Sequence, residues 1–382
     1  MMCMEKTLKK SLLLTLLLPM MAGCTSSSLL EGTISGYEQN KTVNGKDINA
    51  RLQSLVELRA DSTAALSSIL QLEVVDGAYI VRDNDGVYSF DAGGKLMCKY
   101  GARGRGKGEY VNLSCFFVKY NGNVCIIDDY RQSVLEYSRN GSFVSEKKAP
   151  DGTFAYVGTS VAMPEQDAVL CSFMANPEHA DFCALIDGSF KKTSICQSDL
   201  KSTRTAEMYG RHPVSVYNGI AKYVKPYDNH IYTHGDESLT SIEIPKDMVS
   251  TMSDEEKGDY TYLGLLNAAI KEKFVGFTDI FETDRYMMLG VSSYDYVMID
   301  KDKGRCVHYT YFIPKKVSDL PLVNIMASDN HHLYGVVTSN NAHIDDETEV
   351  KNDDFERVVK AMERVRKTDN PVILVYEVAR AE

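Results

Sequence analysis

The sequence has 382 residues, of which 53 are acidic and 42 are basic, and its formal net charge at pH 7 is −11. An acidic chain is a poor partner for nucleic acid and for anionic lipid, because the phosphates of both would repel it. Its length alone allows either two domains or one large all-β domain.

The first residues predict a signal peptide. A short basic stretch is followed by an apolar run over residues 12–21, and small residues close the run just before Cys24. The run is about ten residues long, whereas a helix that spans a bilayer needs about twenty. A basic head, a short apolar core and small residues at the end are typical of export signals, so we expect residues 1–23 to be removed.

The residues around the expected cleavage point carry a more specific signal. Met21-Ala22-Gly23-Cys24 resembles the lipobox of bacterial lipoproteins, which usually has Leu at the first of these positions. The resemblance implies that the Cys24 thiol receives a diacylglyceryl group, and more than one acyl chain on one residue gives stable anchoring. Thr25 stands where an Asp often retains such proteins at the inner membrane. The resemblance therefore favours an outer-membrane lipoprotein of the cell envelope, and the sequence leaves its periplasmic or surface face open.

Residues 24–42 are rich in Ser, Gly, Thr and Asn, a composition typical of flexible linkers. We expect this lipidated segment to tether a folded domain that occupies residues 43–382. Because the chain is acidic, the lipid on Cys24 rather than a basic patch must supply the attachment to the membrane.

Apart from Cys3 in the signal peptide and Cys24, seven cysteines remain, an odd number that cannot all pair within one chain. None forms a CxxC motif or a Cys/His cluster with zinc spacing. Most lie inside apolar, strand-like runs, so we interpret them as buried small hydrophobic residues rather than a disulfide framework. They are Cys98, Cys115, Cys125, Cys171, Cys183, Cys196 and Cys306.

The rest of the chain repeats a pattern of short strands separated by turn residues. In residues 77–100 and 122–144, alternating apolar residues flank Gly- and Asn-rich turns, which are hairpin signals. An anchor residue in the second strand of each unit recurs roughly every 45–60 residues, the spacing of propeller blades. Six units exhaust the chain, which predicts an all-β fold, a six-bladed β-propeller of four-stranded blades. The anchors are Tyr79, Val124, Val169, Ile231, Tyr286 and Leu333.

Two segments, residues 253–273 and 354–367, interrupt the repeat with helical patterns. Each places apolar side chains on one face, and in the second these are Phe355, Val358, Val359, Met362 and Val365. We expect both helices to pack against the outside of the propeller. A polar insertion near residues 197–213 accounts for another long interval between anchors.

A ring of blades leaves two open sheet edges unless the ends of the chain are joined. The strand pattern over residues 371–378 comes after the sixth unit has begun. We therefore predict that a strand near residues 54–58 closes the ring by pairing into the last blade.

Two segments resemble known propellers. Residues 123–144 resemble NHL-type blades, with a strand that ends in Asp, a polar turn, a Val-containing strand and Asn-Gly. Residues 100–110 resemble the connector after the first blade in TolB-like six-bladed propeller lipoproteins of Bacteroidota, with Lys107 where that family usually has Pro. The resemblance implies a six-bladed propeller on a lipid tether, and it brings no catalytic residues and no cofactor.

The same connector has the spacing of a phosphate-binding loop from Gly101 to Lys107. Such a loop needs Ser or Thr next and then a helix whose N-terminus faces the phosphate, and this chain has neither. We interpret the segment as a blade connector. Arg103, Arg105 and Lys107 form a small cationic patch within it, a candidate loop for binding an anionic glycan or peptide.

Other candidate sites have simpler explanations. Asp83-Asn84-Asp85-Gly86 resembles the start of a calcium loop but lacks the downstream Glu, since position 94 is Gly. His230 and His234 would lie about 13 Å apart on a strand, too far for one ion, and His331-His332 falls in a turn, so we expect both pairs to be solvated. Comparable strands end in Asp83, Asp128 and Asp300, a repetition that suits blade turns. We predict no metal site and no catalytic residue.

The sequence thus favours a non-catalytic binding or scaffold protein at the cell envelope, held by Cys24 and facing a protein or glycan partner. The alternative is an envelope hydrolase or lyase of the propeller type, with a metal ion in the central channel.

Overall fold

A computed structural model describes the chain over residues 32–34, 37–39, 50–59, 66, 68–163, 166–174, 181–197, 212–225, 228–235, 239–242, 250–251, 273–274, 276–290, 295–302, 305–310, 324–340, 342 and 352–378. The predicted signal peptide, Cys24 and nearly all of the expected polar insertion lie outside these ranges, as does the helix expected over residues 253–273 except for Lys273, which belongs to a short strand.

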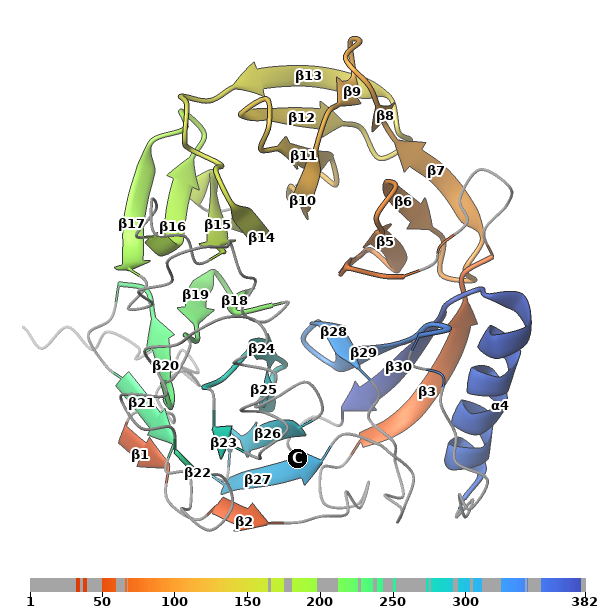
Figure 1. Ribbon diagram of the computed structural model, residues 1–382. Helices are drawn as coiled ribbons and strands as arrows, with labels where there is room; N and C mark the ends of the chain where they lie inside the picture. Colours follow the sequence, from red (N-terminus) through yellow and green to blue (C-terminus); the bar gives the residue numbers. More distant parts are fainter. Residues whose placement is uncertain are drawn as a thin grey trace, which may run out of the picture.

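Six sheets form blades around a common axis, each built on four antiparallel strands, as predicted (Figure 1). Blade 1 consists of β4 (Gln71–Val75), β5 (Ala78–Arg82), β6 (Val87–Phe90) and β7 (Leu96–Tyr100). Blade 2 consists of β10 (Leu113–Val118), β11 (Val124–Asp128), β12 (Ser133–Tyr137) and β13 (Phe143–Lys148). Blade 3 consists of β14 (Val157–Met163), β15 (Ala168–Phe173), β16 (Asp181–Asp187) and β17 (Lys192–Gln197).

The other three blades each include a strand from the N-terminal part of the chain. Blade 4 consists of β18 (Val214–Tyr217), β19 (Ile220–Tyr223), β20 (His230–Thr233), β21 (Leu239–Ile242) and β1 (Gly32–Ile34). Blade 5 consists of β24 (Asp279–Glu282), β25 (Tyr286–Gly290), β26 (Asp295–Asp300), β27 (Arg305–Thr310) and β2 (Tyr37–Gln39). Blade 6 consists of β28 (Ile325–Ser328), β29 (His332–Val337), β30 (Val372–Val378) and β3 (Ala50–Glu57).

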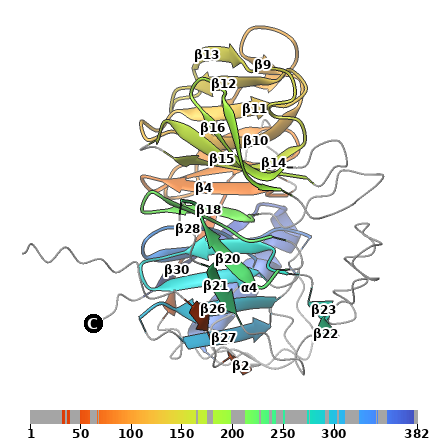
Figure 2. The same cartoon turned by 90° about the vertical axis from the view of Figure 1, so that its left-hand side faces the viewer.

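The first strand of each blade lies nearest the axis, and the strands run between the two faces of the ring (Figures 1 and 2). Because neighbouring strands are antiparallel, the first–second and third–fourth turns gather on one face, which we call the turn face. The second–third turns and the connectors between blades gather on the other, which we call the connector face. Two short pairs lie outside the blades: β8 (Ala102–Arg103) with β9 (Glu109–Tyr110), and β22 (Ser250–Thr251) with β23 (Lys273–Phe274).

The predicted closure of the ring is confirmed. Strand β3 pairs antiparallel with β30 from Ala50 opposite Val378 to Glu57 opposite Val372. The segment then passes to blade 1, where the amide of Arg59 donates to Gly94 O at 2.8 Å. Gly94 has φ of +77°, and a Cβ there would stand 2.0 Å from Glu57 O. Only glycine permits this approach, so the turn of blade 1 is shaped to receive the closing strand.

Two parts of the segment expected to be a flexible tether, residues 24–42, form short strands. Within that range, β1 pairs parallel with β21, and β2 pairs parallel with β27. Both therefore extend a blade at its outer edge (Figure 1). The turn-rich composition suggested a linker, but three-residue strands need little sequence pattern of their own when an existing sheet edge supplies the hydrogen bonds.

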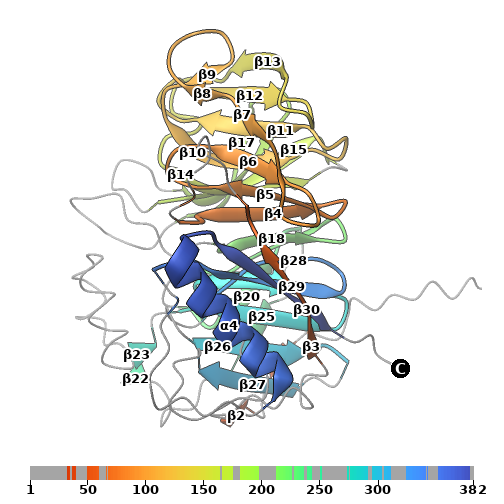
Figure 3. The same ribbon diagram turned by 90° about the vertical axis from the view of Figure 1, so that its right-hand side faces the viewer.

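Helix α4 (Asp353–Thr368) confirms the second predicted helix and packs on the outside of blade 6 beside β3 and β30 (Figure 3). Asn352 Oδ1 caps it by accepting from Phe355 N at 2.8 Å. Its buried face contains Ala361 where we expected Val359, which is only half-buried. Arg357 also joins the helix to the closing strand by donating to Leu52 O at 3.1 Å.

One predicted anchor is wrong. Ile231 lies on β20, the third strand of blade 4, and the second strand is β19. Strands β18 and β19 are four residues each and join through Asn218 and Gly219, both with positive φ. The sequence pattern does not identify this hairpin because its strands are so short, although Asn-Gly is a preferred sequence for its two-residue turn.

The core lies between the faces of neighbouring blades. Among the described residues, apolar clusters fill the junctions between blades 1 and 2, 2 and 3, 3 and 4, 5 and 6, and 6 and 1. Four cysteines are fully buried in these clusters, which confirms their interpretation as small hydrophobic residues: Cys115, Cys125, Cys171 and Cys183. Cys98 and Cys196 are half-buried on outer strands.

Candidate functional site

In the cationic connector, residues 101–110, the backbone folds around the carboxylate of Glu109. Gly106 N donates to Glu109 Oε2 at 2.7 Å, and Gly104 N donates to Tyr110 O at 2.8 Å. A Cβ on Gly104 would stand 2.1 Å from Glu109 Oε2, so the acidic side chain fills the centre of the loop. With a carboxylate in that place and a strand following, the loop cannot cradle a phosphate.

The three predicted ligand-binding residues of this loop are exposed but do not converge. Arg103 Nη2 donates to Asn84 O at 3.4 Å, and Lys107 Nζ lies 5.9 Å from the centroid of the Phe143 ring. Arg105 is exposed on the same loop. The side chains share the connector face near blades 1 and 2.

The repeated aspartates cap turns, as expected. Asp83 Oδ1 accepts from the amides of Asp85 and Gly86, each at 2.8 Å, which explains the calcium-like sequence without a metal. Asp128 Oδ2 accepts from Val111 N at 2.6 Å and so also holds the incoming connector. Asp300 caps a turn too, by accepting from the amide of Asp302. It ends a third strand rather than a second, so it is not equivalent to the other two.

The histidine pairs are not simply solvated. His230 Nδ1 and the hydroxyl of Tyr232 both bond to Asp228. The arrangement recurs in blade 6, where His332 and Tyr334 bond to Asp329. In both places the aspartate also accepts from the amide of the histidine, so the same motif holds the β19–β20 turn of blade 4 and the β28–β29 turn of blade 6.

Hydrogen bonding sets the ionisation of these turn aspartates. Burial alone would raise the pKa of Asp329, but the bonds from Tyr334, the His331 amide and His332 outweigh it and hold the pKa below its usual range. The pKa of Asp228 is lowered against burial in the same way, by Tyr232 and His230. Across the described part of the chain, no three His, Cys, Asp or Glu side chains are placed to hold a metal ion.

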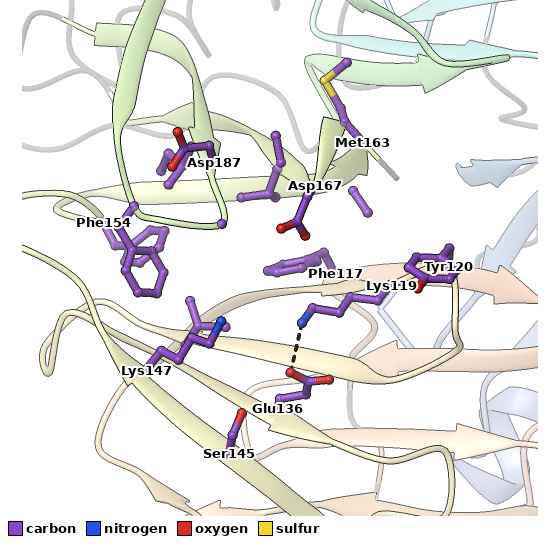
Figure 4. A pocket seen from close by; sticks show the side chains of 17 residues that line it. Phe117, Lys119, Tyr120, Glu136, Ser145, Lys147, Phe154, Met163, Asp167 and Asp187 are labelled. Carbon is purple, nitrogen blue, oxygen red and sulfur yellow. Dashed lines mark hydrogen bonds and ion pairs between the residues drawn. The ribbon is translucent and has the colours of Figure 1, made fainter. Parts of the chain in front are cut away.

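A pocket opens between blades 2 and 3 (Figure 4). Its cavity volume is about 100 Å³. Buried apolar side chains form its floor: Phe117 from β10, Phe154 from the connector before β14, Val169 from β15 and Ile186 from β16. Phe154 packs edge-on against Phe190, with ring centroids 5.9 Å apart.

Polar side chains surround this apolar floor. Lys119 Nζ bonds to Glu136 Oε2 at 2.8 Å, and Asn123 Nδ2 donates to Glu136 Oε1 at 2.7 Å. Burial opposes ionisation of Glu136, but the Asn123 and Lys119 bonds outweigh it and lower its pKa. The carboxylate is therefore held ionised and both of its oxygens are occupied.

Two aspartates stand on the blade 3 side of the pocket. Asp187 Oδ1 accepts from the amides of Ser189 and Lys191, each at 2.9 Å, and the Ser189 hydroxyl and these amides lower its pKa. A Cβ on Gly188 would stand 2.4 Å from Asp167 Oδ2, so the glycine lets the two turns of blade 3 approach. The wall of the pocket is thus made of turns fixed by their own hydrogen bonds.

Tyr120 lies at the mouth of the pocket and is 83% exposed. It belongs to the Lys119-Tyr120-Asn121-Gly122 turn of blade 2, on the turn face. The sequence did not predict this site, because its residues come from turns and strands of two blades. The one available signal was a large aromatic residue at a tight turn, where small polar residues are usual.

The sequence matches the family described as "Domain of unknown function (DUF4934)" over residues 35–377. The chain belongs to this family. None of the curated proteins compared with the sequence matches it. The family assignment agrees with a propeller that occupies most of the chain, while the TolB-like and NHL-type resemblances stay predictions.

Solved structures share the fold of this DUF4934 protein. The crystal structure of a "Putative exported protein" from Bacteroides fragilis is similar with a TM-score of 0.66 and 17% sequence identity, over 91% of this chain and 100% of that one. A member of the DUF4221 family from Bacteroides vulgatus is similar with a TM-score of 0.51 and 8% identity, over 87% and 98%. Virginiamycin B lyase from Staphylococcus aureus has a TM-score of only 0.42 at 12% identity, over 75% and 81%, and carries no argument about activity.

Among the residues whose placement the structure gives, no helix is long and apolar enough to cross a membrane.

Proposed function

We propose that this DUF4934 propeller is a non-catalytic binding protein of the cell envelope that takes an apolar side chain of a protein partner into the pocket between blades 2 and 3. The pocket with its exposed Tyr120 carries the proposal. A buried apolar pocket beside an exposed aromatic residue is the arrangement that anchors most of the energy of a protein interface.

The volume and polarity of the pocket favour a protein partner over a glycan. A volume of about 100 Å³ holds one side chain but not a sugar with its hydration. Glu136 and Asp187 are already hydrogen-bonded within the protein, so they offer little to a row of sugar hydroxyls. Charged side chains at the rim of a pocket can instead orient a partner protein as it binds.

A photo-cross-linking pair tests the proposal. Tyr120 is replaced by the photoreactive residue benzoylphenylalanine in cells, and Tyr130 is replaced in a matched variant. Tyr130 is 71% exposed in the second–third turn of the same blade, so it stands on the connector face. We expect a discrete protein adduct from position 120 and none from position 130.

A second substitution separates pocket binding from chance collision. Ala162 lines the pocket and is half-buried, so Ala162→Phe fills it. This variant should abolish the adduct from position 120 while the protein keeps its melting temperature within a few degrees. Equal adducts from both positions, an adduct made of glycan, or an adduct that survives Ala162→Phe would overturn the proposal.

The envelope location rests on the lipobox resemblance at Cys24. Lipid on this residue would confine binding to the reach of the segment that precedes β1. The variant Cys24→Ser should move the protein from the detergent phase to the aqueous phase in a detergent partition experiment. Partition that does not change would contradict lipid anchoring without touching the pocket.

A further inference from the structure

Two cysteines of blade 3 stand directly opposite each other on neighbouring strands. Cys183 on β16 and Cys196 on β17 are register partners. In every other described strand pairing, a cysteine faces a different residue type, as Cys98 faces Ser89. Directly opposite residues in an antiparallel pair have their Cβ atoms about 4.5–5.5 Å apart, close to the 3.5–4.5 Å that a disulfide requires.

Both sulfur atoms lie on the side of the sheet that faces blade 4. Cys183 belongs to the apolar cluster between blades 3 and 4, and Cys196 packs against that cluster. Tyr223 of blade 4 is in the same cluster, and after burial the two cysteines are the largest causes of its raised pKa. A shared neighbour places the two thiols together rather than on opposite faces.

The local backbone gives the pair freedom to adjust. The register of β16 with β17 shifts on both sides of the pair, between Asp181 and Cys183 and again between Cys183 and Ala184. Such irregularities change the local twist and direction of a strand. The pair thus lies at an irregular point of the ladder, and a disulfide requires the Cβ atoms to be about 1 Å closer than in a regular pair.

The two thiols differ in access. Cys183 is fully buried, whereas Cys196 is half-buried on β17, the outermost strand of blade 3. Burial raises the pKa of Cys183 well above its usual range, so it is a poor first nucleophile. Cys196 is the residue that an external oxidant meets first.

We propose that Cys183 and Cys196 form a cross-strand disulfide that fastens the outer strand of blade 3 when the protein meets a disulfide oxidant, such as a dithiol–disulfide oxidoreductase of the envelope. The inference that this happens in cells rests on the proposed envelope location, since disulfides persist in oxidising compartments. The structure shows the reduced form, with both residues as thiols.

The chemistry takes two exchange steps. The Cys196 thiol, on losing its proton, attacks one sulfur of the oxidant's disulfide, forms a mixed disulfide and releases one thiol. The Cys183 thiol then loses its proton and attacks Cys196 Sγ, which forms the intramolecular bond and releases the second thiol. Two electrons and two protons pass from the cysteines to the oxidant, whose disulfide becomes two thiols.

Oxidation of the purified native chain tests the geometry. The protein is incubated with oxidised glutathione, its remaining thiols are alkylated after denaturation, and peptides are mapped by mass spectrometry. We expect a peptide that joins residues 183 and 196, and loss of both residues from the alkylated pool together. Cys98 is the matched control, because it too is half-buried on an outer strand but faces Ser89.

Variants define the outcome that overturns the proposal. Cys98→Ser should leave the link intact, and Cys196→Ser should leave Cys183 fully alkylatable. If Cys196 stops at the mixed disulfide with glutathione while Cys183 remains a thiol, the proposed pair is wrong. Trapping thiols in intact cells before lysis then separates the two proposals, because a link that forms in the purified chain but not in cells contradicts the envelope location alone.

Discussion

The two halves of the ring are built differently. Blades 1–3 each consist of four strands consecutive in the chain, over residues 71–197. Blades 4–6 each take a strand from the N-terminal part, namely β1, β2 and β3. The N-terminal segment therefore reaches three successive blades before blade 1 begins. Local hairpins therefore suffice for one half of the ring, whereas the other half depends on strands that precede the first blade in the chain.

The halves also differ in how inner strands are joined. In the first half, Gln71 of β4 donates to Phe116 O of β10 at 2.6 Å and accepts from Phe116 N at 3.2 Å. Ser160 of β14 donates to the same Phe116 O at 3.0 Å, so three blades meet at one peptide group. These bonds are neutral.

In the second half a charged cluster takes this role. Glu282 at the end of β24 is only 3% exposed and bonds to Lys222 of blade 4 and Lys301 of blade 5, at 2.7 and 3.1 Å. Its amide also donates to the Ser328 hydroxyl of blade 6 at 3.1 Å. A buried carboxylate between two lysines depends on every partner, because a charge left alone in the interior is costly.

The largest expected effect comes from the N-terminal strands. Deletion of residues 1–58 removes β3 with buried Leu52, Val56 and Leu58, and should cost at least about 5 kcal/mol in the free energy of unfolding. Deletion of residues 1–45 removes β1 and β2 but keeps β3, and should cost less than about 2 kcal/mol. Denaturant unfolding measures both. Because the longer deletion contains the shorter one, equal losses would show that the closing strand adds nothing to the stability that the short parallel strands provide.

Next in size is the charged cluster. Glu282→Gln leaves two half-buried lysines without their carboxylate and should destabilise the protein by about 3–5 kcal/mol. The matched control is Glu377→Gln, which breaks the exposed pair with Arg51 and should cost less than about 1 kcal/mol. Similar losses in the two variants, compared by thermal unfolding, would contradict the role of the buried cluster.

The first half should respond to pH through Glu73. This residue lies on β4, and burial raises its pKa to about 7 against a hydrogen bond with Gln71. The folded state then keeps its proton to higher pH than the unfolded state, whose carboxyl has the ordinary value of 4.5. Glu73 makes its full contribution to the free energy of unfolding below pH 4.5. This contribution decreases as the pH rises to about 7, by at most about 3 kcal/mol.

Glu73→Gln should flatten that part of the stability profile, and Glu363→Gln on the exposed face of α4 should not. Unfolding curves at several pH values between 4 and 8 make the comparison. A profile that is unchanged by Glu73→Gln would rule out this group as the cause.

The smallest expected effect on stability comes from the uncharged hydrogen bonds that Gln71 and Ser160 make with the backbone of Phe116. Gln71→Leu leaves the Phe116 amide without its bond and should cost about 1–3 kcal/mol. Ser160→Ala removes one of two bonds to Phe116 O and should cost about 1 kcal/mol. If Ser160→Ala proved the more damaging change, the junction would be held by blade 3 rather than by blade 1.

Much of the fold could be predicted because its signals are local. The Asn140-Gly141 turn and alternating apolar residues identify hairpins, since side chains alternate between sheet faces and glycine supplies positive φ. The closing strand also followed from a general rule about open edges rather than from a strong pattern. Local signals did not identify β18 and β19, which are only four residues each, and Ile231 was therefore assigned to the second strand of blade 4 instead of the third.

The candidate site could not be predicted in the same way. Phe117, Phe154 and Ile186 read as ordinary core residues, and only the packing of blade 2 against blade 3 leaves space between them. Cys183 and Cys196 likewise look unremarkable in sequence, because their pairing depends on the register of β16 and β17. The sequence did indicate Arg103, Arg105 and Lys107, but it could not show that Glu109 closes their loop.

The all-β class, the six repeated units and the closed ring thus follow from the sequence, because strand alternation and turn chemistry act over a few residues. The positions of the N-terminal strands, the pocket and the paired thiols become visible in the folded chain alone. These depend on contacts between residues far apart in the chain, and such contacts are fixed by packing and register rather than by local preference.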